Sequence, residues 1–151
     1  MADEVCIDSN LALIRVLPDD RRPQAESLFR LWRSQDVRLV APPLFSAEVT
    51  SVIRQKVYDR FLTAEDGERA FAQSLNWVVA IAAPQNLQRT AWFMAKLIDQ
   101  RRAYDPQYLA LARLLGCEFW TGDERLYNAA HRTLPWVHWV GEAPREPQLT
   151  R

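Results

Sequence analysis

The sequence predicts an α/β fold in which helices cover both faces of a parallel sheet. Short apolar runs rich in β-branched residues alternate with longer segments whose apolar residues recur every three or four positions. Strands separated by helices throughout require crossover connections, and these make the strands parallel. A length of 151 residues and a hydrophobic content of 48% suit a single domain with its own core.

The first part of the chain is expected to contain two strands and three helices. Residues 5–8 form a short apolar strand, and the apolar stretch 11–17, which a proline terminates, is a short helix. Residues 22–35 place apolar side chains on one helical face and charged ones on the other. A second strand at 38–42 ends in two prolines, and a third helix follows at 44–58.

The middle of the chain predicts a helix, an apolar strand and a long helix. Thr63, with an acid three residues later, resembles a helix cap and opens a helix that runs to residue 76. The β-branched run VVAIAA at 78–83 is a third strand. Pro84 begins a helix to residue 102, whose two final arginines suit a helix carboxyl end.

The last part predicts a buried helix and two more strands. Residues 104–115 are apolar nearly all round, which indicates a helix buried on several sides, and Gly116 ends it. A fourth strand is expected at 117–121, a short helix at 123–131 and a fifth strand at 136–140. The parallel sheet therefore has about five strands.

Composition narrows the possible functions. One domain is expected over residues 1–140, with 141–151 a frayed tail because it contains few apolar residues. The absence of an 18-residue apolar run, and an acidic amino terminus, favour a cytoplasmic protein without a membrane partner. Cys6 and Cys117 favour free buried thiols over a disulfide. The net charge is zero, so any nucleic-acid contact must be local.

Two acids stand where strands end. Asp8 closes the first strand and Asp123 follows the fourth, and ligands of open parallel sheets bind beyond the carboxyl ends of the strands. Asp123 has three interpretations: a helix cap, a residue of a solvated loop, or a member of a site. An aspartate after a strand is most often a cap or turn residue, but two of them at equivalent exits strengthen the functional interpretation.

Two further acids lie on helices. Glu48 borders an apolar stripe, which also fits an ordinary edge residue, and Asp105 precedes Pro106, which also fits a helix cap. Two carboxylates about 5 Å apart repel by roughly 3 kcal/mol, so a cluster of these acids requires protonation or a bound cation. Oxygen ligands without cysteine or histidine select hard ions, which favours Mg²⁺ or Mn²⁺ and metal-assisted phosphodiester hydrolysis.

Four short motifs in order carry a resemblance to a known family. They are DSN at 8–10, FSAEVTSVI at 45–53, YDPQYLALARLLG at 104–116 and TGDERL at 121–126. Over roughly residues 4–140 the chain resembles the PIN-domain family and, within it, the small VapC-like toxins of bacterial and archaeal toxin–antitoxin pairs. Each motif alone is weak, and the specificity comes from their order and separation.

The resemblance implies a three-layer α/β/α fold with sheet order 3-2-1-4-5 and an endoribonuclease that depends on Mg²⁺ or Mn²⁺. It also implies an RNA substrate, a homodimer and a small antitoxin partner. Catalysis and metal binding fall to Asp8, Glu48, Asp105 and Asp123. Supporting positions around them fall to Ser9, Asn10 and Thr121, whose expected work is to orient the ligands.

Three other functions remain open on the sequence alone. The chain could be a PIN-like module that binds RNA or protein without cutting, or a metal-dependent phosphatase of small molecules. A response-regulator receiver also has aspartates at strand exits, but it needs a lysine after a late strand, and Lys56 and Lys96 both fall inside expected helices. RNA contacts stay unassigned, although five arginines lie near the motifs: Arg15, Arg54, Arg101, Arg102 and Arg125.

Overall fold

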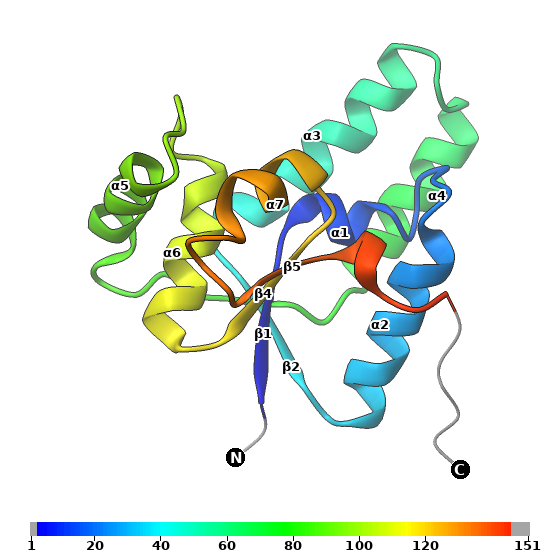
Figure 1. Ribbon diagram of the computed structural model, residues 1–151. Coiled ribbons are helices and arrows are strands. Elements are labelled where there is room, and N and C mark those ends of the chain that lie inside the picture. Colours follow the sequence, from blue (N-terminus) through cyan, green and yellow to red (C-terminus); the bar gives the residue numbers. More distant parts are fainter. Residues whose placement is uncertain (1–2, 146–151) are drawn as a thin grey trace.

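A computed structural model describes residues 3–145, which fold around a five-stranded sheet in the order β3-β2-β1-β4-β5 (Figure 1). All four neighbouring pairs are parallel. The structure confirms the expected parallel sheet and the strand order that the family resemblance implied. The strands are β1 (Glu4–Ile7), β2 (Arg38–Ala41), β3 (Ala80–Ile81), β4 (Glu118–Thr121) and β5 (Val137–Trp139).

Helices cover the sheet on both sides, which completes the three-layer α/β/α arrangement. In Figure 1, α5 and α6 lie on one side of the strands and α2 lies on the other. The α-helices are α1 (Ser9–Leu13), α2 (Arg22–Ser34), α3 (Leu44–Tyr58), α4 (Ala64–Leu75), α5 (Leu87–Leu97), α6 (Asp105–Leu115) and α7 (Glu124–Ala130). A short 3-10 helix, η1 (Val140–Glu142), follows β5.

The core lies where β1, β4 and α6 meet. Cys6, Ile7 and Phe119 are fully buried in the two central strands, and Tyr108 and Leu109 of α6 pack on them with at most 1% exposure. The expectation of a helix buried on several sides is confirmed, and Gly116 ends it with a left-handed φ of 66°. Both cysteines are free thiols, as expected.

Two elements are shorter than the sequence indicates. The helix that begins near Pro84 ends at Leu97 instead of residue 102, because Asp99 takes a left-handed φ of 53° that stops the helix. Strand β3 has two residues where six were expected, since it lies at the edge of the sheet and pairs only with β2. Val78, in the expected strand, is 90% exposed.

The carboxyl-terminal segment stays packed beyond the expected domain end at residue 140. Val140 in η1 is fully buried, and Ala143 is 7% exposed. Packing therefore extends three residues into the segment expected to fray, and residues 146–151 of that segment lie outside the described part. Within residues 3–145, no helix is long and apolar enough to cross a membrane.

Candidate active site

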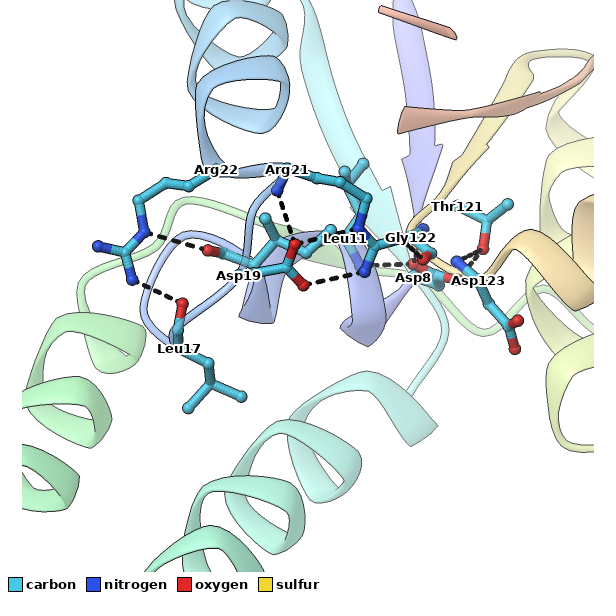
Figure 2. Close-up of polar contacts among 10 residues, drawn as sticks. Asp8, Leu11, Leu17, Asp19, Arg21, Arg22, Thr121, Gly122 and Asp123 are labelled. Carbon is cyan, nitrogen blue, oxygen red and sulfur yellow. Dashed lines mark hydrogen bonds and ion pairs between the residues drawn. The ribbon is translucent and has the colours of Figure 1, made fainter. Parts of the chain in front are cut away.

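Asp8 lies at the exit of β1, in a buried position beside the exit of β4. The register pairs Ile7 with Trp120, so the next residue of each strand, Asp8 and Thr121, meet across the sheet edge. The Asp8 carboxylate accepts hydrogen bonds from the Thr121 hydroxyl, from Leu11 N at 2.8 Å and from Gly122 N at 3.2 Å (Figure 2). Asp8 is therefore the amino-terminal cap of α1 and also a tie between two strands.

Gly122 lets the turn after β4 approach the first turn of α1. A Cβ atom at this position would lie 2.7 Å from the backbone of Asn10 and of Leu11, closer than real Cβ contacts. Only glycine allows the Gly122 amide to reach Asp8 without moving backbone. The arrangement of the two strand exits thus depends on the missing side chain in the middle of the TGD motif.

Asp123 caps the helix that follows it, which is one of the three interpretations that the sequence left open. Its carboxylate accepts hydrogen bonds from Arg125 N at 2.9 Å and Leu126 N at 3.4 Å, so it caps α7. Its backbone N donates to the Thr121 hydroxyl at 2.9 Å, and that hydroxyl in turn donates to Asp8. The cap fixes Asp123 at the edge of the sheet, next to Asp8.

Glu48 reaches the same edge from α3 and is held by two hydroxyl groups. Ser9 Oγ donates to Glu48 Oε1 at 3.3 Å, and the Tyr108 hydroxyl donates to the same oxygen. Burial, together with the hydrogen bond to this carboxylate, raises the pKa of Tyr108 well above its ordinary value. Tyr108 therefore stays a hydrogen-bond donor throughout the physiological pH range.

Asp105 begins α6, but it does not cap the helix. The residue in the cap position is Tyr104, and no side-chain hydrogen bond caps this end. Within residues 3–145, no hydrogen bond to the Asp105 carboxylate is found, although it lies close enough to the other acids for their charges to act on it. Burial, Asp123 and Glu48 raise its pKa from 3.8 to about 6.

Asp105 lies within electrostatic range of the other three predicted acids, because its charge acts on Asp8, and the charges of Glu48 and Asp123 act on it. Burial raises the pKa of Asp8 from 3.8 to about 7, against the lowering effect of its hydrogen bonds, and the charge of Asp105 adds to the rise. The predicted supporting residues Ser9 and Thr121 both contact an acid directly. Asn10 differs from them, since it is exposed and lines a neighbouring cavity.

Three residues of the site escaped the sequence interpretation: Tyr108, Gly122 and Arg21. Tyr108 lies in an almost wholly apolar helix, and the sequence does not indicate that its hydroxyl faces Glu48. Arg21 Nη1 donates to Gly122 O at 2.6 Å, and its guanidinium forms an ion pair with Asp19 at 2.9 Å. Figure 2 shows that Arg21 connects the loop before α2 to the turn after β4. Of these three residues, only Gly122 could have been singled out from the sequence, because a glycine between Thr121 and Asp123 indicates a close backbone approach.

The arginines that lie near the motifs in sequence occupy different parts of the structure. Arg15 lies over the Phe29 ring at 4.2 Å and faces Glu26, away from the acids. Arg54 lies over the Tyr58 ring at 5.7 Å. Of the five candidates, Arg125 lines the cavity beside the acids. Sequence proximity to a motif was therefore a poor guide to which face an arginine occupies.

The donor atoms suit a hard cation, but the acids are not clustered tightly around one point. In the described part of the chain, no three of the His, Cys, Asp and Glu side chains are arranged to hold one metal ion. Mg²⁺ commonly binds through one or two carboxylates and keeps several waters, so a three-carboxylate cage is not required. Asp105, which has no hydrogen bond within residues 3–145, is the carboxylate most available as a ligand.

Comparison with known proteins places the chain among VapC relatives. It is 29% identical to the VapC ribonuclease Mb0985 of Mycobacterium bovis over 131 residues, which cover 87% of this chain and 94% of the relative. The same figures hold for ribonuclease VapC9 of Mycobacterium tuberculosis. The chain is therefore similar in sequence to VapC ribonucleases over most of its length. No model of a protein family matches the chain.

A solved structure supports the fold of this VapC-like protein. The crystal structure of Mycobacterium tuberculosis VapC20, a sarcin-ricin loop cleaving toxin, aligns with this chain with a TM-score of 0.58. The alignment covers 83% of this chain and 95% of VapC20, at 19% sequence identity. At that identity the likeness shows the fold alone.

Proposed function

We propose that this protein is a metal-dependent endoribonuclease that hydrolyses RNA phosphodiester bonds and serves as the toxin of a toxin–antitoxin pair. The observation that carries the proposal is that Asp105 lies within electrostatic range of Asp8, Glu48 and Asp123, and that the pKa values of Asp8 and Asp105 are raised. The relatives are named as ribonucleases, which supports the same reaction.

The side chains have separate tasks in this proposal. Asp105 and Asp123 would hold the metal, because both lie partly open to solvent at the sheet edge. Glu48 has one oxygen committed to Ser9 and Tyr108, which leaves its other oxygen to orient a water molecule or to contact the ion. Asp8 adds negative charge from its buried position, and Thr121 holds the Asp8 carboxylate in one orientation.

The bound ion, Mg²⁺ or Mn²⁺, would neutralise the acids and assist the attack of water on phosphorus. The protein supplies the positioning. The caps of α1 and α7 fix Asp8 and Asp123, and the buried Tyr108 fixes Glu48, so that the carboxylates are oriented before the metal arrives. This preorganisation lowers the cost of assembling the site around the ion.

The partners follow from the family resemblance. We infer an RNA substrate, a small antitoxin protein, a homodimer and a cytoplasmic location. Light scattering on the purified protein tests the dimer directly.

The test of the reaction is cleavage of a folded RNA mixture with Mn²⁺, with EDTA and with the Asp123→Asn variant. Asparagine is as good a helix cap as aspartate, so this change removes the charge and keeps α7 capped. The expected result is cleavage by the parent and at least a hundredfold loss in both other arms. Asp36→Asn is the matched control, because Asp36 lies in the exposed turn before β2, at the opposite edge of the sheet.

Two outcomes would count against the nuclease. Equal cleavage by the parent in Mn²⁺ and in EDTA would exclude a metal-dependent reaction. Hydrolysis of a chromogenic phosphate ester without cleavage of RNA would favour a phosphatase. A folded parent that binds metal but cuts no RNA, including ribosomal RNA, would favour a module that binds without cutting.

A further inference from the structure

A cavity of about 580 Å³ opens beside the acids at the edge of the sheet. Asn10, Gly122 and Asp123 line one end of it, and Lys56 and Phe61, at and just beyond the end of α3, line another part. Its volume lies within the range of roughly 300–1,000 Å³ typical of small-molecule sites. A ligand in this cavity, the Phe61 cavity, would therefore lie next to the carboxylates that the proposed reaction uses.

The lining of the Phe61 cavity is apolar in one part and cationic in another. Side chains of Ile14, Leu17 and Leu62 supply apolar surface. Lys56 and Arg125 supply positive charge, and within residues 3–145 neither forms an ion pair. The acids Asp19, Asp123 and Glu124 also line it, but Asp19 is already paired with Arg21 and Asp123 belongs to the proposed metal site.

Phe61 is an exposed aromatic residue in a turn that a backbone hydrogen bond stabilises. It is 72% exposed, although phenylalanine usually lies inside proteins. Its N–H donates to Lys56 O at 2.9 Å, and Lys56 Nζ lies 5.0 Å from the centre of its ring. Arg60, just before it, adopts a left-handed φ of 63°, which residues other than glycine rarely do. The turn thus presents one face of the ring together with a cation.

An aromatic face beside an unpaired cation is the arrangement that binds single-stranded nucleic acid. Bases stack on aromatic side chains while neighbouring lysines and arginines contact the phosphates. A base inside a duplex is covered on both faces by its neighbours, so it cannot stack on Phe61 unless it is unpaired. The combination favours a single strand over a duplex.

We propose that the Phe61 cavity binds one unpaired nucleotide of the RNA, immediately beside the bond that is cut. The base stacks on Phe61, Lys56 contacts an adjacent phosphate, and Arg125 contacts the backbone nearer the acids. This inference rests on the proposed nuclease function and extends it, because it assigns Phe61, Lys56 and Arg125 to one nucleotide beside the acids.

The test is binding of RNA to a protein that does not cut. In an Asp105→Asn background with EDTA, fluorescence anisotropy measures the Kd for a labelled single strand of roughly twelve nucleotides and for the corresponding duplex. The expected results are tighter binding of the single strand, a Kd about tenfold higher for Phe61→Ala, and recovery with Phe61→Trp. Lys56→Ala should lower the salt dependence of log Kd by about one unit.

The chain offers matched controls for both changes. Trp92 on α5 is an exposed aromatic residue outside the cavity, and Lys96 on α5 is the only other lysine. Trp92→Ala and Lys96→Ala should leave the Kd within about twofold of the parent. Melting temperatures of all variants establish that each is folded, and an exposed ring such as Phe61 contributes little to stability.

The outcomes separate this inference from the nuclease proposal. If the parent cuts RNA but Phe61→Ala binds as tightly as the parent, or Trp92→Ala weakens binding equally, the nucleotide site is wrong and the nuclease stands. That result would also be expected if a protein partner filled the cavity instead of RNA. If the parent does not cut but binding of the single strand depends on Phe61, the nuclease proposal fails and the nucleotide site stands.

Discussion

Asp8 and Asp105 are both aspartates with a raised pKa, yet they occupy two different kinds of environment. Asp8, at the junction of β1 and β4, is 2% exposed and accepts hydrogen bonds from two backbone amides and one hydroxyl. Asp105, at the start of α6, is half-buried, and its carboxylate has no hydrogen bond within residues 3–145. Asp8 therefore stabilises the fold through its hydrogen bonds, whereas the Asp105 carboxylate makes no contact that stabilises the fold.

The difference shows how one site divides its work. A carboxylate with both oxygens occupied stabilises the two turns around it, so its loss is expected to damage the structure as well as the activity. A partly buried carboxylate without hydrogen bonds, near Asp123 and Glu48, destabilises the protein in the absence of a cation. Such an acid has no evident structural task, which favours a role as a ligand.

The largest expected effect is on the Asp8 side. Asp8→Ala leaves the Leu11 and Gly122 amides and the Thr121 hydroxyl without their acceptor, and should lower the free energy of unfolding by on the order of 3 kcal/mol. Asp8→Asn keeps one acceptor oxygen and should cost less than half of that. Urea unfolding of both variants measures the difference, and equal stability of parent and Asp8→Ala would refute the framework role.

A second change acts on the same junction without touching an acid. Gly122→Ala places a Cβ against the backbone of Asn10 and Leu11, and should destabilise the protein by about 2 kcal/mol through overpacking. Gly116→Ala is the control, since a Cβ there meets no atom within 4 Å and is strained only by its left-handed φ of 66°. Cleavage and thermal unfolding should both suffer in Gly122→Ala, whereas Gly116→Ala should lose stability and keep its activity per folded molecule.

The smallest expected effect is on the Asp105 side, and it has the opposite sign. Because the pKa of Asp105 is 3.8 in the unfolded chain and about 6 when folded, the folded protein binds more protons between these values. The free energy of unfolding therefore falls as the pH rises from about 4 to about 6. Asp105→Asn removes this loss and, allowing for partial exposure to solvent, should stabilise the metal-free protein by about 1–2 kcal/mol above pH 7.

Urea unfolding in EDTA at about pH 4 and about pH 8 checks the Asp105 prediction. Parent and Asp105→Asn should be nearly equal at the lower pH and differ at the higher one, whereas Asp36→Asn should follow the parent at both. A variant that is less stable than the parent at the higher pH would mean that Asp105 is a structural residue. The proposed difference between a structural Asp8 and a non-structural Asp105 would then be wrong.

Much of the fold could be predicted from sequence because local patterns carry it. Helix α3 falls at the predicted residues 44–58, since its apolar stripe is continuous, and Thr63 caps α4 as expected. The predictions failed where tertiary position decided the outcome. Strand β3 shrank because it lies at an edge, and α5 stopped at Asp99, where a non-glycine residue took a conformation that no local pattern indicates.

The sequence by itself determined which acids stand at strand exits and helix starts, because the spacing of apolar residues along the chain distinguishes strands from helices. It also predicted a hard cation, since the four acids offer only oxygen ligands. The tertiary structure alone decided that Tyr108 meets Glu48 and that Gly122 meets α1. It also decided that Arg125, but not Arg15, lines the cavity beside the acids. These contacts join residues far apart in the chain, and only the packing of α6, β1 and β4 around one core sets their distances.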